Sequence, residues 1–158
     1  MAPLAELRLV EHQLKTFEEE CRSQNAGALP RAMMREVLLG DSPADATRRL
    51  KSGIDHVYRV QYAPERVGLS TIDPVTRERK PVKNDDPHYL SEAFMQERWF
   101  LGTPQDIAGK IVDWQKRLQL DHFIFSARQP GQQLRHAVDD LTSFAQQVIP
   151  VVRAGLSA

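Results

Sequence analysis

The chain of 158 residues is 41% hydrophobic and 27% charged, an ordinary globular composition that argues against a wholly disordered protein. Its 21 Lys and Arg residues balance 21 Asp and Glu residues, and this zero net charge argues against a nucleic acid or an anionic membrane as the main partner. No apolar run approaches the roughly 20 residues of a membrane span. Residues 1–10 also lack the apolar core of a signal peptide, so we expect a cytoplasmic protein.

The first part of the chain, residues 1–63, predicts a helix, a strand and a second helix. Apolar side chains recur at helical spacing through residues 4–21, and the short apolar run at residues 31–40 has the length of a strand. The second helix should end before Pro64, because the residue before a proline disfavours helical geometry. The expected buried positions are Leu4, Leu7, Leu14, Phe17 and Cys21 in the first helix, and Ala46, Leu50, Ile54, Val57 and Tyr58 in the second.

Residues 64–98 change in composition. They contain four prolines, a run of charged residues at 77–80 and no hydrophobic periodicity, apart from a short helical piece around Leu90 to Arg98. We therefore predict an irregular insertion. Loops of this length inside compact domains are usually functional or mobile, which makes this one a candidate lid or substrate loop.

Two stretches share the same order of residue types, LLGDSPADA at 38–46 and FLGTPQDIA at 100–108. In each, apolar residues and a glycine precede a hydroxyl residue, a proline and an acidic residue three positions after the hydroxyl. This is the spacing of a capping box with proline at the first helical position. We therefore expect Ser42 and Thr103 to be helix N-caps.

The last third, residues 99–158, predicts a helix, a strand and a helix. The strand covers residues 120–127, with Phe123 and Phe125 on one side and His122, Ile124 and Ser126 on the other. Pro150 should limit the final helix. Lys110 should face away from the core. The expected buried positions are Ile107, Ile111, Trp114 and Leu118 in the first of these helices, and Leu134, Val138, Leu141, Ala145 and Val148 in the last.

Alternating helices and strands predict an α/β fold with parallel strands, because parallel neighbours need crossover connections. Only two strands are clear, and two strands do not make an independent sheet covered by helices on both faces. The pattern therefore indicates part of a larger arrangement.

Three stretches carry a resemblance: MREVLLGDSPADATRRL, GTPQDIAGKIVDWQKRLQLDHFIFSARQPG and LTSFAQQVIPVVR. Their order and spacing resemble the carboxyl-terminal end of the luciferase-like, flavin-dependent monooxygenase family, over about residues 30–62 and 99–153. The resemblance implies that residues 1–158 form part of a (β/α)8 TIM-type barrel, namely about two βα units plus the inserted loop. Such barrels usually need about 250 residues.

The resemblance implies an oxidoreductase in which reduced FMN activates molecular oxygen against a small organic substrate, with a deazaflavin as an open alternative and no metal. The strands that carry much of the flavin pocket in the family are missing from these residues. An amino-terminal half-barrel partner or a homo-oligomer would then complete the barrel. Two alternatives stay open: a non-catalytic half-barrel remnant or binding module that pairs with a separate amino-terminal half, and an unrelated small α/β domain.

Candidate site residues follow from the barrel, where chemistry collects at the carboxyl ends of the strands. By the resemblance, Ser126 and Arg128 could hydrogen-bond the ring edge or phosphate of the flavin; otherwise Ser126 packs inside the barrel and Arg128 is solvated. Arg35 and Glu36 are adjacent in an apolar strand, so they must point to opposite faces and one of them faces the barrel interior. The resemblance places Arg35 near the flavin, and the alternative is a structural ion pair. The catalytic residues are unknown.

Overall fold

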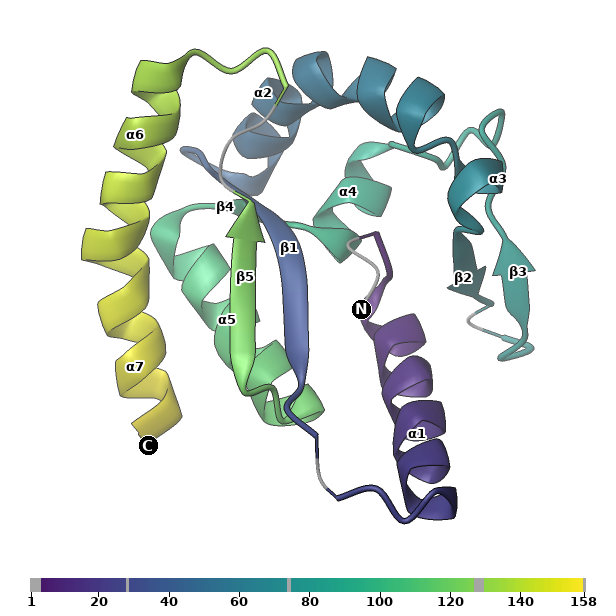
Figure 1. Ribbon diagram of the computed structural model, residues 1–158. Helices are drawn as coiled ribbons and strands as arrows, with labels where there is room; N and C mark the ends of the chain where they lie inside the picture. The colour runs from purple at the N-terminus through teal and green to yellow at the C-terminus, as the bar shows by residue number, and fades with distance from the viewer. Residues whose placement is uncertain (1–3, 28, 74, 127–129, 158) are drawn as a thin grey trace.

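The structure, a computed structural model, describes residues 4–27, 29–73, 75–126 and 130–157 (Figure 1). It has an α/β fold with a three-stranded parallel sheet and a separate two-stranded antiparallel hairpin. The described strands do not close into a barrel. None of the described helices is both long enough and apolar enough to cross a membrane.

The elements follow one another along the chain with short connections. The strands are β1 (Ala32–Leu39), β2 (Ser70–Ile72), β3 (Arg79–Pro81), β4 (Phe100–Gly102) and β5 (His122–Ser126). The helices are α1 (Leu7–Ser23), α2 (Pro43–His56), α3 (Pro64–Val67), α4 (Glu92–Arg98), α5 (Pro104–Leu118), α6 (Leu134–Ser143) and α7 (Ile149–Ser157). Two π-helical turns continue helices, η1 (Val57–Gln61) after α2 and η2 (Phe144–Val148) between α6 and α7.

Strand β1 lies in the middle of the parallel sheet, in the order β4-β1-β5. Its first part pairs with β5, from Ala32 opposite His122 to Glu36 opposite Ser126. Its last residues pair with β4 through Leu39 opposite Gly102. The two expected strands and their parallel direction are therefore confirmed, and the short strand β4 is an addition to the prediction.

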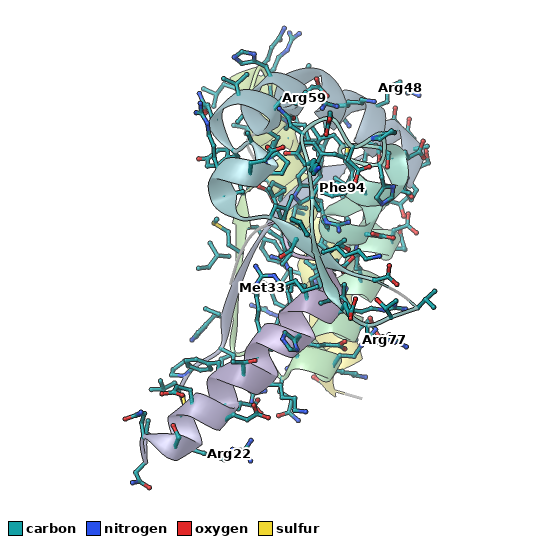
Figure 2. The ribbon with its side chains drawn as sticks, turned by 90° about the vertical axis from the view of Figure 1, so that its right-hand side faces the viewer. Arg22, Met33, Arg48, Arg59, Arg77 and Phe94 are labelled. Atoms are coloured by element: carbon teal, nitrogen blue, oxygen red, sulfur yellow. The ribbon has the colours of Figure 1, made fainter. Side chains whose placement is uncertain are left out.

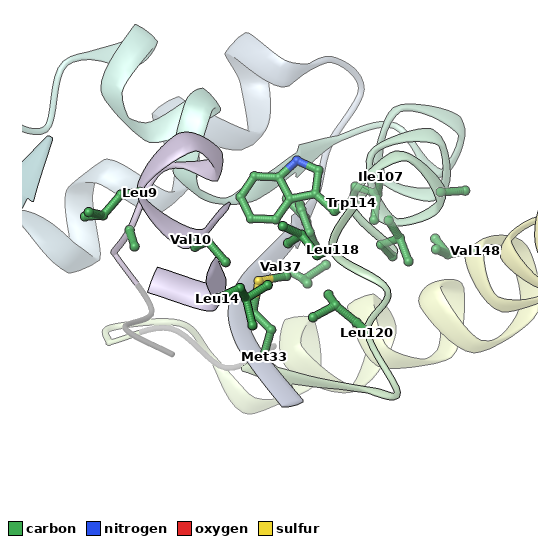
Figure 3. Close-up of a cluster of buried hydrophobic side chains, with 14 of the residues drawn as sticks. Leu9, Val10, Leu14, Met33, Val37, Ile107, Trp114, Leu118, Leu120 and Val148 are labelled. Carbon is green, nitrogen blue, oxygen red and sulfur yellow. The ribbon is translucent and has the colours of Figure 1, made fainter. Parts of the chain in front are cut away.

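One face of the sheet is covered by α1, α5 and η2. Apolar side chains from these elements and from the sheet pack together in the larger of two hydrophobic clusters (Figure 3). The stripe predicted for α5 is buried there, with Ile107 fully buried and Trp114 only 2% exposed. On α1 the prediction is confirmed for Leu14, which is buried, but Phe17 is 43% exposed, and Leu9 and Val10 are buried in addition. Figure 2 shows how buried and exposed side chains are distributed in the molecule. Met33 and Phe94 are buried inside it, and Arg22, Arg48 and Arg77 are exposed on its surface.

Both predicted N-caps are present. The Thr103 hydroxyl accepts a hydrogen bond from the Asp106 backbone N–H at 3.2 Å, and the Asp106 carboxylate accepts from the Thr103 N–H at 3.0 Å, which completes the capping box. Ser42 accepts from the Asp45 N–H at 3.1 Å. Both caps precede a proline at the start of the helix, so the turn chemistry read from the sequence is confirmed.

The insertion at residues 64–98 is more regular than the sequence indicates. Besides the expected short helix, which is α4, it contains α3 and the β2–β3 hairpin, and its apolar residues pack in the second cluster against α2. Glu6, just before α1, accepts hydrogen bonds from the Thr71 hydroxyl at 2.8 Å and the Ile72 N–H at 2.5 Å. It also pairs with the buried guanidinium of Arg98 at 3.2 Å, so one carboxylate connects α1, β2 and α4.

The final helix also differs from the prediction. It passes Pro150 and continues to Ser157, because the wider π-helical turn η2 comes directly before it and the Ile149 N–H bonds the carbonyl of Phe144. Of the five positions predicted to be buried, only Val148 is. The other four are exposed, and Leu134, Val138 and Leu141 are 66%, 53% and 52% exposed. The covered side consists instead of Ala137, Phe144, Val148 and Val152.

We expect Thr103→Ala to lower the free energy of unfolding by about 1 kcal/mol, because it removes a cap that satisfies backbone donors of α5. Urea unfolding followed by circular dichroism measures the change. Thr16→Ala, on an exposed position inside α1, is the matched control and should change stability by no more than about 0.5 kcal/mol. Equal effects of the two substitutions would contradict the capping role.

Candidate functional site

A cavity of about 880 Å³ lies between the sheet, the turn η1 and the β2–β3 hairpin. Side chains from β1 and β5 form one wall, and the segment that leads from η1 into the hairpin forms the opposite wall. The lining residues are Leu4, Ala5, Leu9, Gln13, Met34, Glu36, Val57, Tyr58, Gln61, Tyr62, Val67, Gly68, Leu69, Ser70, Arg79, Ser126 and Pro130. A cavity of this size, largely apolar and with a few polar groups, is typical of a small-molecule site.

The alternation of side chains along β1 decides which residues face the cavity. Met34 and Glu36 line it, whereas Met33 and Val37 pack in the cluster beneath α1 and α5. Arg35 and Glu36 therefore point to opposite faces of the strand, as the sequence predicts. Glu36 lines the cavity wall, and Arg35 does not.

Glu36 is 7% exposed, and the Tyr58 hydroxyl donates a hydrogen bond to its Oε1. Burial raises the pKa of Glu36 above its ordinary value, although the Tyr58 hydrogen bond and the charge of Arg35 both act to lower it. Burial and the neighbouring carboxylate raise the pKa of Tyr58 as well, so this hydroxyl keeps its proton. Tyr58 also contacts the Trp99 ring, at 5.2 Å between centroids.

Arg35, a candidate flavin ligand from the sequence, is fully buried on the other face. Its guanidinium donates to the carbonyls of Ala5 at 2.9 Å and Met34 at 2.8 Å, and lies 5.0 Å from the centre of the Trp114 ring. Burial lowers its pKa to about 10, so it stays charged at neutral pH. These contacts are structural, between the sheet and α5 and the segment before α1.

Ser126, the second candidate, lines the cavity at the end of β5 and is the register partner of Glu36. The structure thus brings Ser126 and Glu36 together on adjacent strands. Arg128, the third candidate, lies outside the described residues.

Lys110, expected to face away from the core, is instead half-buried beside the Phe100 and Trp114 rings. Its ammonium donates to the carbonyls of Gln96 and Trp99, the latter at 2.8 Å. Burial lowers its pKa to about 8. Lys110 satisfies carbonyl groups at the end of α4, and it does not line the cavity.

The phosphate end of FMN is a test of whether the described residues can hold that cofactor. The cavity has room for a flavin ring, but phosphate sites need guanidinium groups or backbone N–H groups directed at the anion. Among the described lining residues, Arg79 supplies the one guanidinium, and it is exposed with its Nε bonded to the Ser70 hydroxyl at 2.5 Å. The described residues therefore fit a ring-sized molecule but do not fit FMN as a whole.

Comparison with known proteins adds no assignment: no model of a protein family matches the sequence, and no curated protein matches it. Within the described ranges, no group of three or more His, Cys, Asp or Glu side chains is placed to hold a metal ion.

Sequence reasoning missed Tyr58 and the wall formed by residues 67–70. Tyr58 was assigned to the apolar face of a helix, which is correct for its ring but leaves its hydroxyl without a role. A buried tyrosine hydroxyl usually needs a hydrogen-bond partner, and this was the available signal that a polar group of β1 lies opposite it.

The buried carboxyl group of Glu36 should make the free energy of unfolding depend on pH. Its folded pKa lies above the ordinary value of 4.5, so between these two values the folded state binds more protons than the unfolded state. Its contribution to stability is complete below pH 4.5 and is lost as the pH rises through the folded pKa.

We therefore expect the free energy of unfolding of the wild type, relative to Glu36→Gln, to fall by up to about 1.4 kcal/mol per pH unit across that window. Urea unfolding of both proteins from pH 4 to pH 8 measures this difference. Glu19→Gln, on an exposed position of α1, controls for the loss of one charge from the chain. If the free energy of unfolding of the wild type, relative to Glu36→Gln, rises with pH instead, folding lowers the pKa of Glu36 and the prediction is wrong.

Proposed function

We propose that this chain forms part of a luciferase-like, flavin-dependent monooxygenase, as the carboxyl-terminal part of a (β/α)8 barrel that supplies the substrate cavity. The observation that carries the proposal is the parallel pair β1–β5, which directs Glu36 and Ser126 into one cavity of about 880 Å³. Ser126 is the last residue of β5, and barrel enzymes bind their substrates at the carboxyl ends of the strands.

In this proposal a small organic substrate occupies the cavity, and molecular oxygen is the second substrate. Reduced FMN, or a deazaflavin, supplies the redox chemistry when bound. Because the described residues lack a phosphate clamp, residues outside the described ranges or another polypeptide would hold most of the flavin. The single cysteine and the absence of a membrane-spanning helix among the described residues are compatible with the cytoplasm, which we include in the proposal.

A partner for the sheet and for α6 is the second part of the proposal. Strand β5 stands at the end of the sheet order, and its outer edge has no partner among the described strands. On α6 the exposed side chains of Leu134, Val138 and Leu141 form an apolar stripe at helical spacing. An amino-terminal half-barrel, in the same or a separate chain, would cover both; a homo-oligomer is the alternative partner.

The same stripe supports a second candidate function, a non-catalytic half-barrel that acts as a binding module. Its apolar residues need a partner whether or not chemistry follows, and the lack of a phosphate clamp among the described residues also agrees with a module that binds no flavin. Flavin binding by the assembled protein separates the two candidates.

Flavin titration tests what this chain alone supplies. We expect FMN and riboflavin to bind equally weakly, with dissociation constants above roughly 100 μM, because no described group is placed to clamp the phosphate. Quenching of flavin fluorescence measures both affinities. Low-micromolar binding of FMN, or a clear preference for FMN over riboflavin, would contradict the view that other polypeptide holds the flavin.

The apolar stripe leads to a prediction about stability. We expect Leu134→Gln with Leu141→Gln to change the free energy of unfolding by less than about 0.5 kcal/mol per site, because both side chains are more than half exposed. Sedimentation should show weaker self-association of the double variant. Ala137→Gln is the matched control on the covered side of α6, where the residue is 3% exposed, and it should be strongly destabilising. A loss of several kcal/mol in the double variant would show that the stripe is already covered.

A further inference from the structure

One wall of the cavity combines a carboxyl group with two aromatic side chains. Glu36, Tyr58 and Tyr62 all line it, and the two tyrosine rings lie 5.7 Å apart. A carboxylate attracts cations and accepts their hydrogen bonds, and the face of an aromatic ring attracts cations as well. This wall therefore has the chemistry of a site for an organic cation.

Glu36 also has hydrogen-bonding capacity that the described protein leaves unused. Tyr58 donates to Oε1, whereas Oε2 is buried and has no hydrogen-bond partner at normal geometry among the described residues. The Trp99 side chain is close enough to act to lower the pKa of Glu36, but its ring N–H also lacks a partner at normal geometry. Buried polar atoms normally have partners. The terminal torsion of a glutamate side chain is broad, so either oxygen can turn toward a molecule in the cavity. A primary ammonium group, with three donors, suits such an acceptor.

The rest of the cavity is suited to an apolar group. Met34, 40% exposed and two residues from Glu36 on the same face of β1, borders the wall, and other apolar side chains continue it. Those residues are Leu4, Leu9, Val57, Val67 and Leu69. Covering such surfaces with a hydrocarbon chain is favourable because it removes apolar area from water.

Two described arginine side chains close to the cavity wall, Arg35 and Arg79, are bonded to other groups. The guanidinium of Arg35 lies on the opposite face of β1, against Ala5 and Trp114. Arg79, on the opposite wall, donates to the Ser70 hydroxyl. Burial raises the pKa of Glu36 and favours its neutral form, whereas the Tyr58 hydrogen bond and the charge of Arg35 favour the ionised form, which is the form that a cation needs.

We infer that the cavity binds an apolar molecule that carries a primary ammonium group, with the ammonium on Glu36 beside Tyr58 and Tyr62 and the apolar part against Met34 and Leu69. This deepens the proposed function by naming its substrate class, and it rests on that function only in making the amine a substrate. Binding itself needs no flavin.

Isothermal titration of the full chain with n-hexylamine, without flavin and at neutral pH, tests the inference. Hexan-1-ol and hexanoate are probes of equal chain length without the positive charge. We expect n-hexylamine to bind at least about tenfold more tightly than hexan-1-ol, and hexanoate to bind most weakly.

Glu36→Gln should weaken n-hexylamine binding by about tenfold or more while leaving hexan-1-ol within about twofold. Glu19→Gln is the matched control and should bind n-hexylamine like the wild type. Circular dichroism reports whether Glu36→Gln folds. If it does not, Met34→Lys provides a second test, because its ammonium can pair with Glu36 and exclude the amine; Met34→Leu is its control.

Equal affinity for n-hexylamine and hexan-1-ol would overturn the ammonium site, as would undiminished amine binding by folded Glu36→Gln or by Met34→Lys. Because these titrations contain no flavin, such a result leaves the flavin proposal standing. Conversely, amine selectivity in a protein whose assembled form binds no flavin would uphold the site and reject the monooxygenase.

Discussion

The alternation of side chains along β1 is the constraint on which both the core and the cavity depend. β1 pairs with β5 along its first part and with β4 at its end, so its register is fixed on both sides. A slip by one residue would turn every side chain to the other face. Arg35 would then enter the cavity without the carbonyls of Ala5 and Met34, and Glu36 would face Trp114 without the Tyr58 hydroxyl. Two oppositely charged neighbours thus specify the register more strictly than apolar residues would.

The final helix shows how a surface can be patterned for burial and yet be exposed. It has apolar side chains on two sides, and a helix of this kind is normally covered on both. Here Ala137 and Val148 are buried, Val148 within the cluster that α5 and the sheet form, while Leu134, Val138 and Leu141 are exposed. The periodicity read from the sequence was correct as a pattern. It identified the side that the described residues do not cover, because periodicity shows that a stripe is apolar but not which neighbour covers it.

Local interactions were predictable from the sequence, and those between distant segments were not. The Thr103 cap involves groups within four residues, so a short pattern is enough to identify it. Lys110 was predicted to face outward from its position on the helical face, but the carbonyls that it satisfies belong to Gln96 and Trp99, on another helix and the loop after it. Pro150 was expected to end a helix, and the π-helical turn that accommodates it has no recognised sequence signal.

The cavity contains both kinds of feature, those that the local sequence predicts and those that depend on distant segments. That a charged pair within an apolar strand needs partners follows from the sequence, but the partner of Glu36 comes from η1, and the opposite wall comes from a segment without periodicity. There is a physical reason why Arg35 occupies the packed face of β1 and Glu36 the face at the cavity. Arginine can span a packed layer with its aliphatic stem, bond distant carbonyls and stack on an aromatic ring, as Arg35 does with Trp114. Glutamate is shorter and accepts hydrogen bonds only, so it must have donors close by. The face that holds Glu36 is therefore the one on which a hydroxyl, and in our proposal an ammonium group, can approach the strand.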